Sequence, residues 1–224
     1  RMDRHATDPG VFIRSMATRG HLGGLAMATP LAVRVLDAAG FDIVLIETVG
    51  VGQSEVDIVS LADTTVVLLA PGAGDVVQAT KAGILELADV FVVNKSDHPD
   101  ANRTVRDLRH VMSLVRENAS DEQWPTPVVQ TVATEATGID EAADAVAAHR
   151  AWLLARGELD RRRARRAARE IESIALAVLR ARLGDPRSDD RALLTRRVAA
   201  GDLDPYDAAE MMIRNACGPL IDKE

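Results

Sequence analysis

The sequence feature that most constrains the fold is an alternation between short β-branched runs and longer stretches with helical spacing. The short runs are residues 41–46, 64–70, 90–93 and 127–132. They lack strict polar alternation, which is typical of strands buried on both faces. The helical stretches are residues 22–39, 76–87, 102–116 and 139–154. This order predicts an α/β fold with a doubly wound parallel sheet.

The strand pattern stops near residue 154, and the remaining chain has helical spacing throughout. Helices are expected at residues 156–183, 188–200 and 206–215. The first of them carries a cluster of arginines: Arg161, Arg162, Arg163, Arg165, Arg166 and Arg169. Such a run is typical of a solvated helix face, and an acidic partner surface is the alternative. We expect an α/β domain over 1–155 and a helical extension over 156–224.

Composition narrows the functional classes. The net charge of the 224 residues is −7 at pH 7, which argues against a general nucleic-acid-binding protein. Cys217 is the single cysteine, so an intramolecular disulfide framework is excluded and a reducing compartment is indicated. No apolar run approaches the roughly 20 residues that span a bilayer. We expect a cytoplasmic protein without a signal peptide, and neither a membrane nor a nucleic acid as partner.

The tetrapeptide Asn94-Lys95-Ser96-Asp97 directly follows the run 90–93. The carboxyl edge of a parallel sheet is where α/β folds bind ligands. The Asp97 carboxylate could accept hydrogen bonds from the ring N–H and the amine of guanine, whereas adenine offers neither donor. Each such bond is worth roughly 1.5–3 kcal/mol. The stem of Lys95 could lie over the base and Asn94 could join neighbouring loops, although the same residues are also typical of a simple turn.

A glycine-containing segment from Glu47 to Gln53 follows the run 41–46. An acidic residue at a strand end can hold Mg²⁺, and Gly50 would let a backbone N–H approach a terminal phosphate. Gln53 is a candidate for orienting an attacking water. A glycine turn would explain the same residues, and no third glycine completes a dinucleotide-binding fingerprint.

Three further segments carry candidate site residues. The loop 71–75 leads into a predicted helix on which Asp75, Gln78 and Lys81 lie near one face, although a helix cap with two solvated side chains is the alternative. After the last run, the backbone amides of Val132 and Ala133 could meet the guanine carbonyl. Near the start of the chain, Asp8 precedes a glycine-rich loop at 20–24, in which His21 is interpreted as a cap or turn residue.

Together these segments resemble the MeaB/ArgK-type G proteins, a family that includes the human methylmalonic aciduria type A protein. The matching segments are residues 12–24, 47–55, 71–89 and 94–97. The resemblance is strong over roughly 1–155 and looser in the helical tail. It implies a homodimeric GTPase of the SIMIBI class of P-loop proteins. Such proteins bind adenosylcobalamin-dependent methylmalonyl-CoA mutase, gate delivery of its cofactor and protect it from inactivation.

The resemblance also implies residue roles. Asp8 and Glu47 would lie beside Mg²⁺, and the segment 47–53 would be the second switch. A third switch, which couples the mutase to GTP hydrolysis, would contain Asp75, Gln78 and Lys81. Guanine of GTP or GDP would be read by Asn94, Lys95 and Asp97. The C-terminal helices would form the dimerisation arm.

The sequence departs from the family in one respect, because it contains no Gly-x-x-x-x-Gly-Lys-Ser/Thr motif to cradle phosphates. We expect a G protein that is truncated or partly represented, since an α/β sheet without its phosphate-loop strand would expose apolar surface. Two other functions stay open. One is an ATPase or kinase serving basic amino acid transport, and the other is a non-catalytic dimeric adaptor that has lost phosphate binding.

The third-switch assignment predicts the behaviour of Lys81→Ala in the complete protein. Intrinsic GTP hydrolysis should stay largely intact, because the switch acts only when the mutase is bound, and stimulation by the mutase should be blunted. Phosphate release measured with and without mutase separates the two rates. Equal stimulation of mutant and wild type would refute the switch role.

Overall fold

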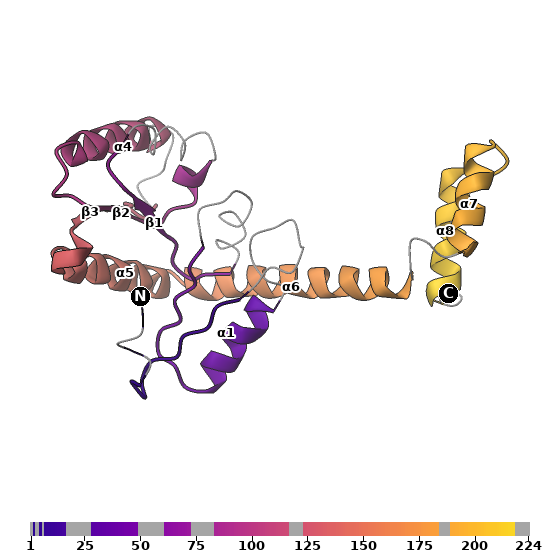
Figure 1. Cartoon of the computed structure of the whole chain (residues 1–224), viewed down its shortest axis with the longest axis horizontal. Helices are drawn as coiled ribbons and strands as arrows, with labels where there is room; N and C mark the ends of the chain where they lie inside the picture. Colours follow the sequence, from indigo (N-terminus) through magenta and orange to yellow (C-terminus); the bar gives the residue numbers. More distant parts are fainter. Residues whose placement is uncertain are drawn as a thin grey trace. The chain divides into compact units, whose positions relative to one another are not determined.

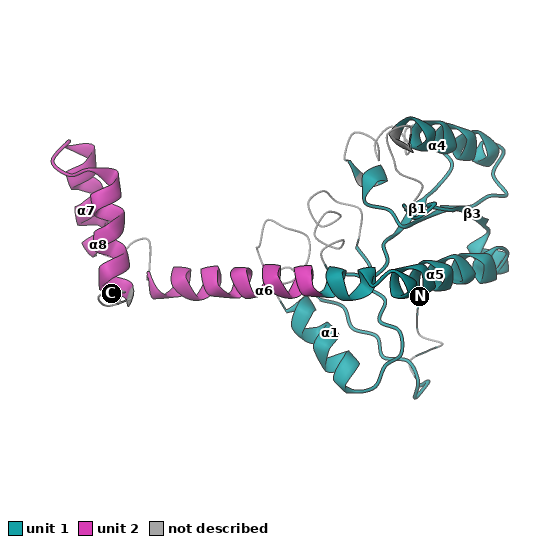
Figure 2. Ribbon diagram, turned by 180° about the vertical axis from the view of Figure 1, so that it is seen from behind, with its two compact units in different colours: residues 1–163 teal, residues 164–224 magenta. Residues whose placement is uncertain are grey.

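The computed structural model describes residues 2, 5, 7–16, 28–48, 61–72, 83–116, 123–183 and 189–217. Figure 1 follows the chain from the N-terminal part through a small sheet to the C-terminal helices. The chain forms two compact units, Arg1–Arg163 and Ala164–Glu224 (Figure 2). None of the helices in the described part is both long and apolar enough to cross a bilayer.

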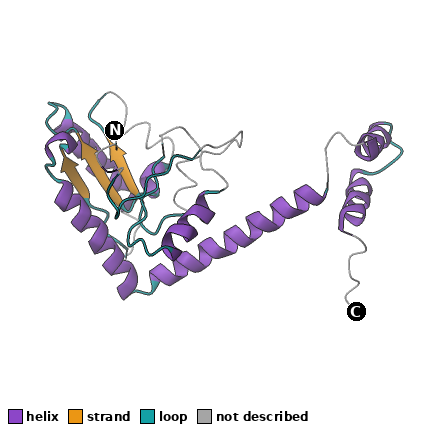
Figure 3. Ribbon diagram, turned by 60° about the horizontal axis from the view of Figure 1, so that its bottom comes forward, coloured by secondary structure: helices purple, strands orange, loops and turns teal. Residues whose placement is uncertain are grey.

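The first unit is organised around a parallel sheet of β1 (Val66–Leu69), β2 (Val90–Asn94) and β3 (Val128–Thr131), in that spatial order (Figure 3). β2 is central and pairs in parallel with both neighbours. Residues 90–93 are almost completely buried. A strand buried on both faces needs apolar side chains at successive positions, which explains the aliphatic run. The prediction of a parallel α/β fold is confirmed.

Two helices sandwich this sheet. α4 (Ala101–Arg116) and α5 (Ile139–Ala155) lie on opposite faces of the sheet (Figure 1). The core under α4 contains Leu69, Ala88, Phe91, Val93, Val105 and Leu108. Val105 and Leu108 are three residues apart and therefore share one face of α4. Because side chains alternate along a strand, Val90 and Val92 point to the opposite layer, which contains the buried Leu153 of α5.

The predicted strand at residues 41–46 is wrong. The structure has irregular chain there, with Ile43 76% exposed and Leu45 91% exposed. A β-branched run becomes a strand only where a neighbouring edge accepts its backbone hydrogen bonds. Within the described residues, β1 pairs with β2 alone, and nothing pairs with 41–46.

Two predicted helices also differ from the structure. α1 (Thr29–Ala38) begins later than the predicted 22–39, with a proline in its first turn, and residues 17–27 lie outside the described part. Residues 76–82 of the predicted helix 76–87 lie outside the described part, and the end of that range is a short 3₁₀ turn, η2 (Ile84–Glu86). Gly83 precedes it with a φ of +68°, a left-handed conformation that interrupts an α-helix.

The C-terminal helices agree with the predicted ranges within a few residues. α6 (Glu158–Arg182) begins in the first unit and continues into the second, which also contains α7 (Asp189–Ala199) and α8 (Pro205–Cys217). α8 starts with Pro205, and the Asp204 side chain accepts the Tyr206 N–H at 2.7 Å. Proline at the first position and an acceptor just before it favour helix initiation. The functional division at residue 155 stays a prediction.

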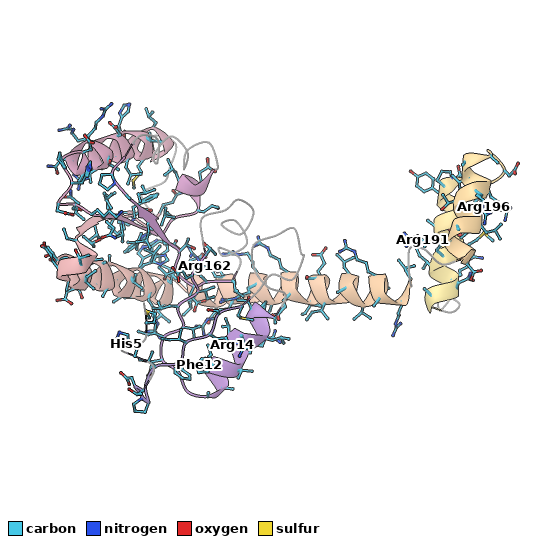
Figure 4. All side chains as sticks on the ribbon, viewed as in Figure 1. His5, Phe12, Arg14, Arg162, Arg191 and Arg196 are labelled. Atoms are coloured by element: carbon cyan, nitrogen blue, oxygen red, sulfur yellow. The ribbon has the colours of Figure 1, made fainter. Side chains whose placement is uncertain are left out.

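A half-hidden ion pair joins the amino end of the sheet to α6. The guanidinium of Arg162 (Figure 4) donates to both carboxylate oxygens of Asp89, at 3.0 and 3.1 Å. Asp89 precedes β2, and its Oδ2 also accepts the N–H of Thr65, which precedes β1, at 2.8 Å. Arg162 further donates to the Asp63 carbonyl at 3.1 Å. One carboxylate therefore holds the starts of two strands and of one helix together.

An aromatic cluster from α5 and the 123–127 segment lies beside this ion pair. The ring of His149 is fully buried, and its Nδ1 lies 2.9 Å from the Thr64 hydroxyl. Its Nε2 lies 3.2 Å from Asp89 Oδ1 but makes no hydrogen bond within the described residues. Trp124 packs against His149 with ring centroids 5.0 Å apart and donates its Nε1–H to the Asp89 carbonyl at 2.7 Å. The two rings thus pack beside the ion pair, in which the Arg162 side chain stays 33% exposed and Asp89 12%.

These contacts act on the pKa of Asp89. Burial alone would raise the pKa of this carboxyl, but the adjacent His149 ring, the Arg162 guanidinium and the Thr65 N–H together outweigh that effect, and the pKa lies below its usual value. A carboxyl whose pKa is lowered in the folded state stabilises the fold above its unfolded pKa. That stabilisation is lost as the pH falls through the lowered value.

We predict that Arg162→Met lowers the free energy of unfolding by about 2 kcal/mol, because it leaves the Asp89 charge unpaired. This predicted loss is smaller than the usual cost of breaking a fully buried ion pair, because Arg162 is 33% exposed. Denaturant unfolding at several pH values measures it. The difference from wild type should be full above about pH 4 and shrink at lower pH, where Asp89 becomes protonated.

Arg163→Met is the matched control. Arg163 is the next residue of the same helix and pairs with Asp63 at 2.8 Å, but more than half of its side chain is exposed. Exposed ion pairs contribute at most about 1 kcal/mol. Equal destabilisation by the two substitutions would show that the two hydrogen bonds from Arg162 to Asp89 contribute no more to stability than the exposed pair of Arg163 with Asp63.

Candidate functional site

The candidate site lies at the carboxyl end of β2 and β3. Asn94 is the last residue of β2, Thr131 is the last residue of β3, and the two are register partners. Both strands run in the same direction, so the loops that follow them emerge at one edge of the sheet. This is the edge at which parallel α/β sheets bind ligands.

The Asn94 side chain joins the two loops. Its Oδ1 accepts a hydrogen bond from the Thr131 hydroxyl and another from the Ala133 backbone N–H, each at 3.1 Å. These bonds connect positions 37 and 39 residues apart in sequence. The carboxamide is therefore held in one orientation at the rim of the sheet.

The turn after Asn94 has an uncommon backbone conformation. Lys95 has a φ of +57°, in the left-handed region where a residue with a Cβ is disfavoured by roughly 1–2 kcal/mol. Two bonds of Ser96 hold the turn: its hydroxyl donates to the Val93 carbonyl at 2.7 Å, and its N–H donates to the Thr131 carbonyl at 3.0 Å. The turn is thus fixed to both strands, in addition to its internal bond from the His98 N–H to the Lys95 carbonyl at 3.0 Å.

Lys95 and Asp97 are both exposed. Within the described residues, no hydrogen-bond partner is found for the Asp97 carboxylate. An ionised carboxylate offers two oxygens with about four acceptor positions. The turn therefore presents acceptors to a ligand from a backbone that is already fixed.

The loop after β3 is closed by a pair of backbone bonds. Val132 donates its N–H to the Thr137 carbonyl at 2.9 Å, and Thr137 donates back to the Val132 carbonyl at 3.3 Å. Both predicted amide donors, Val132 and Ala133, thus already have acceptors within the protein. Their predicted role toward the guanine carbonyl stays a prediction, in which a ligand would replace one of these acceptors.

Gly138 closes this loop and precedes α5 with a φ of +74°. A Cβ at this position would lie 2.1 Å from the Gln130 carbonyl oxygen of β3. The loop can pass this close to the strand only because the residue has no side chain. Gly138 therefore sets the height of the loop above the sheet edge.

The predicted metal-side residues are not gathered into a metal site. Asp8 and Glu47 are both exposed, and Asp8 Oδ1 accepts the Gly10 N–H at 2.9 Å in a local turn. In the part of the chain that the structure describes, no group of three or more His, Cys, Asp or Glu side chains could hold a metal ion. Mg²⁺ in nucleotide sites is commonly bound through only one or two carboxylates together with phosphates and water, so the roles of Asp8 and Glu47 stay predictions.

Several predicted site residues lie outside the described residues: His21, Gly50, Gln53, Asp75, Gln78 and Lys81. Their roles stay predictions. Conversely, sequence reasoning included Ser96 and Thr131 only as members of their segments, without the hydrogen bonds that they make, and it missed Gly138. A threonine at the end of the run 127–132 and a glycine just before a helix were the available signals.

Taken together, the sheet with helices on both faces and the polar rim at its carboxyl end define an α/β fold of the P-loop NTPase type. The chain belongs to the MeaB family, because the family model described as "Methylmalonyl Co-A mutase-associated GTPase MeaB" matches residues 1–186.

Curated relatives and solved structures agree with this membership. A Pyrococcus abyssi protein named "Putative GTPase" is 47% identical over 219 residues, which are 97% of this chain and 68% of that protein. The mouse mitochondrial methylmalonic aciduria type A homolog is 34% identical over 96% of this chain, which spans only 52% of that protein. A crystal structure of an LAO/AO transport system kinase has a TM-score of 0.58 at 27% identity. The match covers 82% of this chain and 60% of the kinase chain.

We predict that Gly138→Ala destabilises the first unit far more than Gly157→Ala. Both glycines have positive φ, so each substitution costs roughly 1–2 kcal/mol of backbone strain, but nothing lies within 4 Å of a Cβ built at Gly157. Thermal unfolding measures both. Gly138→Ala carries the additional cost of displacing β3 or the loop, and equal losses would contradict the close approach.

Proposed function

We propose that this chain is the base-reading and switch-bearing part of a GTP hydrolase that serves adenosylcobalamin-dependent methylmalonyl-CoA mutase. In this role it gates loading of the mutase with its cofactor and protects the enzyme from inactivation. The observation that carries the proposal is the rim of β2 and β3. There Asn94 is fixed by two hydrogen bonds, and the exposed Asp97 follows a turn that both strands hold.

The chemistry of this rim favours guanine. Asp97 can accept from the ring N–H and the exocyclic amine of guanine, and adenine has no matching pair of donors. A site built on acceptors for specific donors discriminates strongly against analogues without them, because its buried or fixed polar groups are then left unpaired. Lys95 would lay its alkyl stem over the base.

The mutase partnership is supported by membership of a family whose model is described as methylmalonyl-CoA mutase-associated. The segments 47–53 and 75–81 would rearrange when the γ-phosphate is lost, and the mutase would accelerate hydrolysis by fixing them. Asp8 and Glu47 would lie on the Mg²⁺ side of the nucleotide. In this proposal GTP is the substrate and GDP the product.

We further propose that the chain acts as a homodimer through its C-terminal helices. On the part of α6 in the second unit, Ile171, Ile174 and Val178 are exposed at a spacing of three and four residues. Apolar side chains at this spacing form one stripe along a helix, which favours packing against another helix.

A second candidate function is an ATP-using kinase connected with basic amino acid transport. It is favoured by the structural similarity to a protein that is called an LAO/AO transport system kinase. The two candidate functions differ in the nucleotide that they require, GTP or ATP. Turnover of GTP and of ATP by the full-length protein separates them, and a strong preference for ATP would reject the guanine assignment.

For the base-reading role we predict that Asp97→Ala in the full-length protein weakens GTP binding roughly 100-fold. The loss of two hydrogen bonds to a charged acceptor accounts for about 3 kcal/mol. Preference for GTP over ATP should largely disappear, and competition titrations with both nucleotides measure it. Unchanged GTP affinity would count against the assignment.

Asp100→Ala is the matched control. Asp100 is another exposed aspartate, three positions after Asp97, and its carboxylate lies 3.7 Å from His98 Nδ1. It is not part of the proposed base contact, so GTP affinity should stay within about twofold of wild type, as expected for a weak surface pair. A control that is unchanged beside a defective Asp97 variant excludes a general charge effect.

A further inference from the structure

We propose that the first turns of α6 are a hinged anchor, which opens as a unit while the sheet beside it stays folded. The α6 anchor is defined by the buried Leu159 and by the bonds of Arg162 and Arg163 to residues that precede β1 and β2. Because α6 continues from the first unit into the second (Figure 2), the anchor is where the first unit holds this helix. The inference goes beyond the proposed function and does not depend on a nucleotide.

The apolar part of the α6 anchor is small. All 25 residues of α6 are described, and Leu159 is the only one of them that is buried. By comparison, α4 contributes Val105 and Leu108 to the core of the sheet. Burial of apolar surface is the main force that holds a helix against a sheet. A single leucine supplies little of that force, so polar contacts account for a large share of the attachment.

The polar part of the α6 anchor consists of arginine bonds that lie near water. Arg162 donates to both carboxylate oxygens of Asp89 and to the Asp63 carbonyl. Arg163 donates to the Asp63 carboxylate at 2.8 Å. The two arginine side chains are 33% and 55% exposed. Water can therefore replace these bonds when the helix leaves, which makes opening less costly than exposing a buried core.

A glycine at the start of α6 provides the hinge. Gly157 separates the end of α5 from the start of α6 and has a φ of +64°. Within the described residues, no atom beyond its chain neighbours lies within 4 Å of a Cβ built there, so packing does not fix this junction. Glycine changes its backbone angles at low cost, and hinges are a few such positions at the ends of elements. α6 can therefore turn about Gly157 while the buried Leu153 keeps α5 on the sheet.

The strands keep their own contacts when the α6 anchor opens. The Thr65 N–H donates to Asp89 Oδ2, and the Trp124 side chain donates to the Asp89 carbonyl. Neither bond involves α6, and the pairing of β1 with β2 does not involve it either. Opening therefore gives the Asp89 carboxylate to water without separating the strands. Proteins open locally in such units where few buried apolar contacts hold a segment.

Thiol labelling of the full-length protein tests this opening. Cys217 and any other native cysteine are first replaced by serine. Leu159→Cys then places a thiol in the α6 anchor, and Leu153→Cys places one at a fully buried position of α5. The Leu159→Cys thiol should react with a maleimide roughly tenfold or more faster than the Leu153→Cys thiol, and its rate should depend less on denaturant, because a local opening exposes less surface than unfolding.

Two neighbouring arginines provide a variant and its matched control. Arg162→Met removes the bonds that close the α6 anchor, so it should accelerate labelling of Leu159→Cys roughly tenfold without changing the dependence on denaturant. Arg161→Met is the control, because Arg161 pairs at 2.6 Å with Glu158 of the same helix, and this bond moves with α6. Labelling in the control should stay within about twofold of the parent.

Hydrogen exchange of the unsubstituted full-length protein gives a second readout, which stands even if a cysteine variant does not fold. The backbone amides of residues 162–168 in α6 should exchange faster than those of residues 146–152 in α5. Both segments lie inside their helices, but a helix end that leaves its support frays. Mass spectrometry of peptides from the two helices measures the difference.

Three results would overturn the inference. The first is equal labelling of the two thiols with the same dependence on denaturant, which would mean that the anchor opens only when the whole unit unfolds. The second is equal acceleration by Arg161→Met and Arg162→Met. The third is equal exchange of the two helical segments. None of these measurements reads nucleotide binding or hydrolysis, so each result leaves the proposed function standing.

Discussion

The pairing of Asp89 with Arg162 is the interaction on which the arrangement of the first unit depends. A carboxylate removed from water costs several kcal/mol unless it is paired and hydrogen-bonded. Here one carboxylate meets a two-pronged guanidinium and a backbone N–H at the same time. Because an arrangement that buried Asp89 without Arg162 would leave the charge uncompensated, this contact favours the observed meeting of β1, β2 and the first turns of α6. Beside it, Trp124 packs on the His149 ring and donates a hydrogen bond to the Asp89 carbonyl.

The two ends of β2 carry different tasks. At its amino end the polar groups are enclosed and mutually satisfied, so they contribute to stability and leave nothing for a ligand. At its carboxyl end, the Asn94 side-chain oxygen accepts two hydrogen bonds, no partner is found for its NH₂ group among the described residues, and Asp97 is exposed. Parallel strands place all their carboxyl ends at one edge of the sheet. A strand of five residues can therefore have fully paired polar groups at its amino end and exposed polar groups at its carboxyl end. Membership of the MeaB family fits this division, because a nucleotide-hydrolysing protein needs a fixed frame beneath loops that change.

The parts of the fold that could be predicted are those set by local sequence. The buried run 90–93 and the spacing of the helices after residue 100 depend on neighbouring residues alone. The run 41–46 has the same local character, yet it is irregular, because a strand also needs a paired edge that sequence does not reveal. The Asp89–Arg162 bond joins residues 73 apart, so no local pattern could indicate it. In the candidate site, the placement of Asn94 at the sheet edge followed from its strand, but the bond from Thr131 is a long-range contact and was missed.

The left-handed conformation of Lys95 has a consequence for how binding and folding are linked. A glycine would adopt this conformation at lower cost, so the chain gives up some stability at the residue whose stem is proposed to cover the base. A ligand that packs on that stem would contribute favourable contacts, which would offset the cost of the left-handed conformation in this turn. Since a ligand that binds only the folded state stabilises that state, nucleotide would act as a structural component of this rim. The protein without nucleotide would then have the same fold at lower stability, and bound nucleotide would stabilise the carboxyl edge of its sheet.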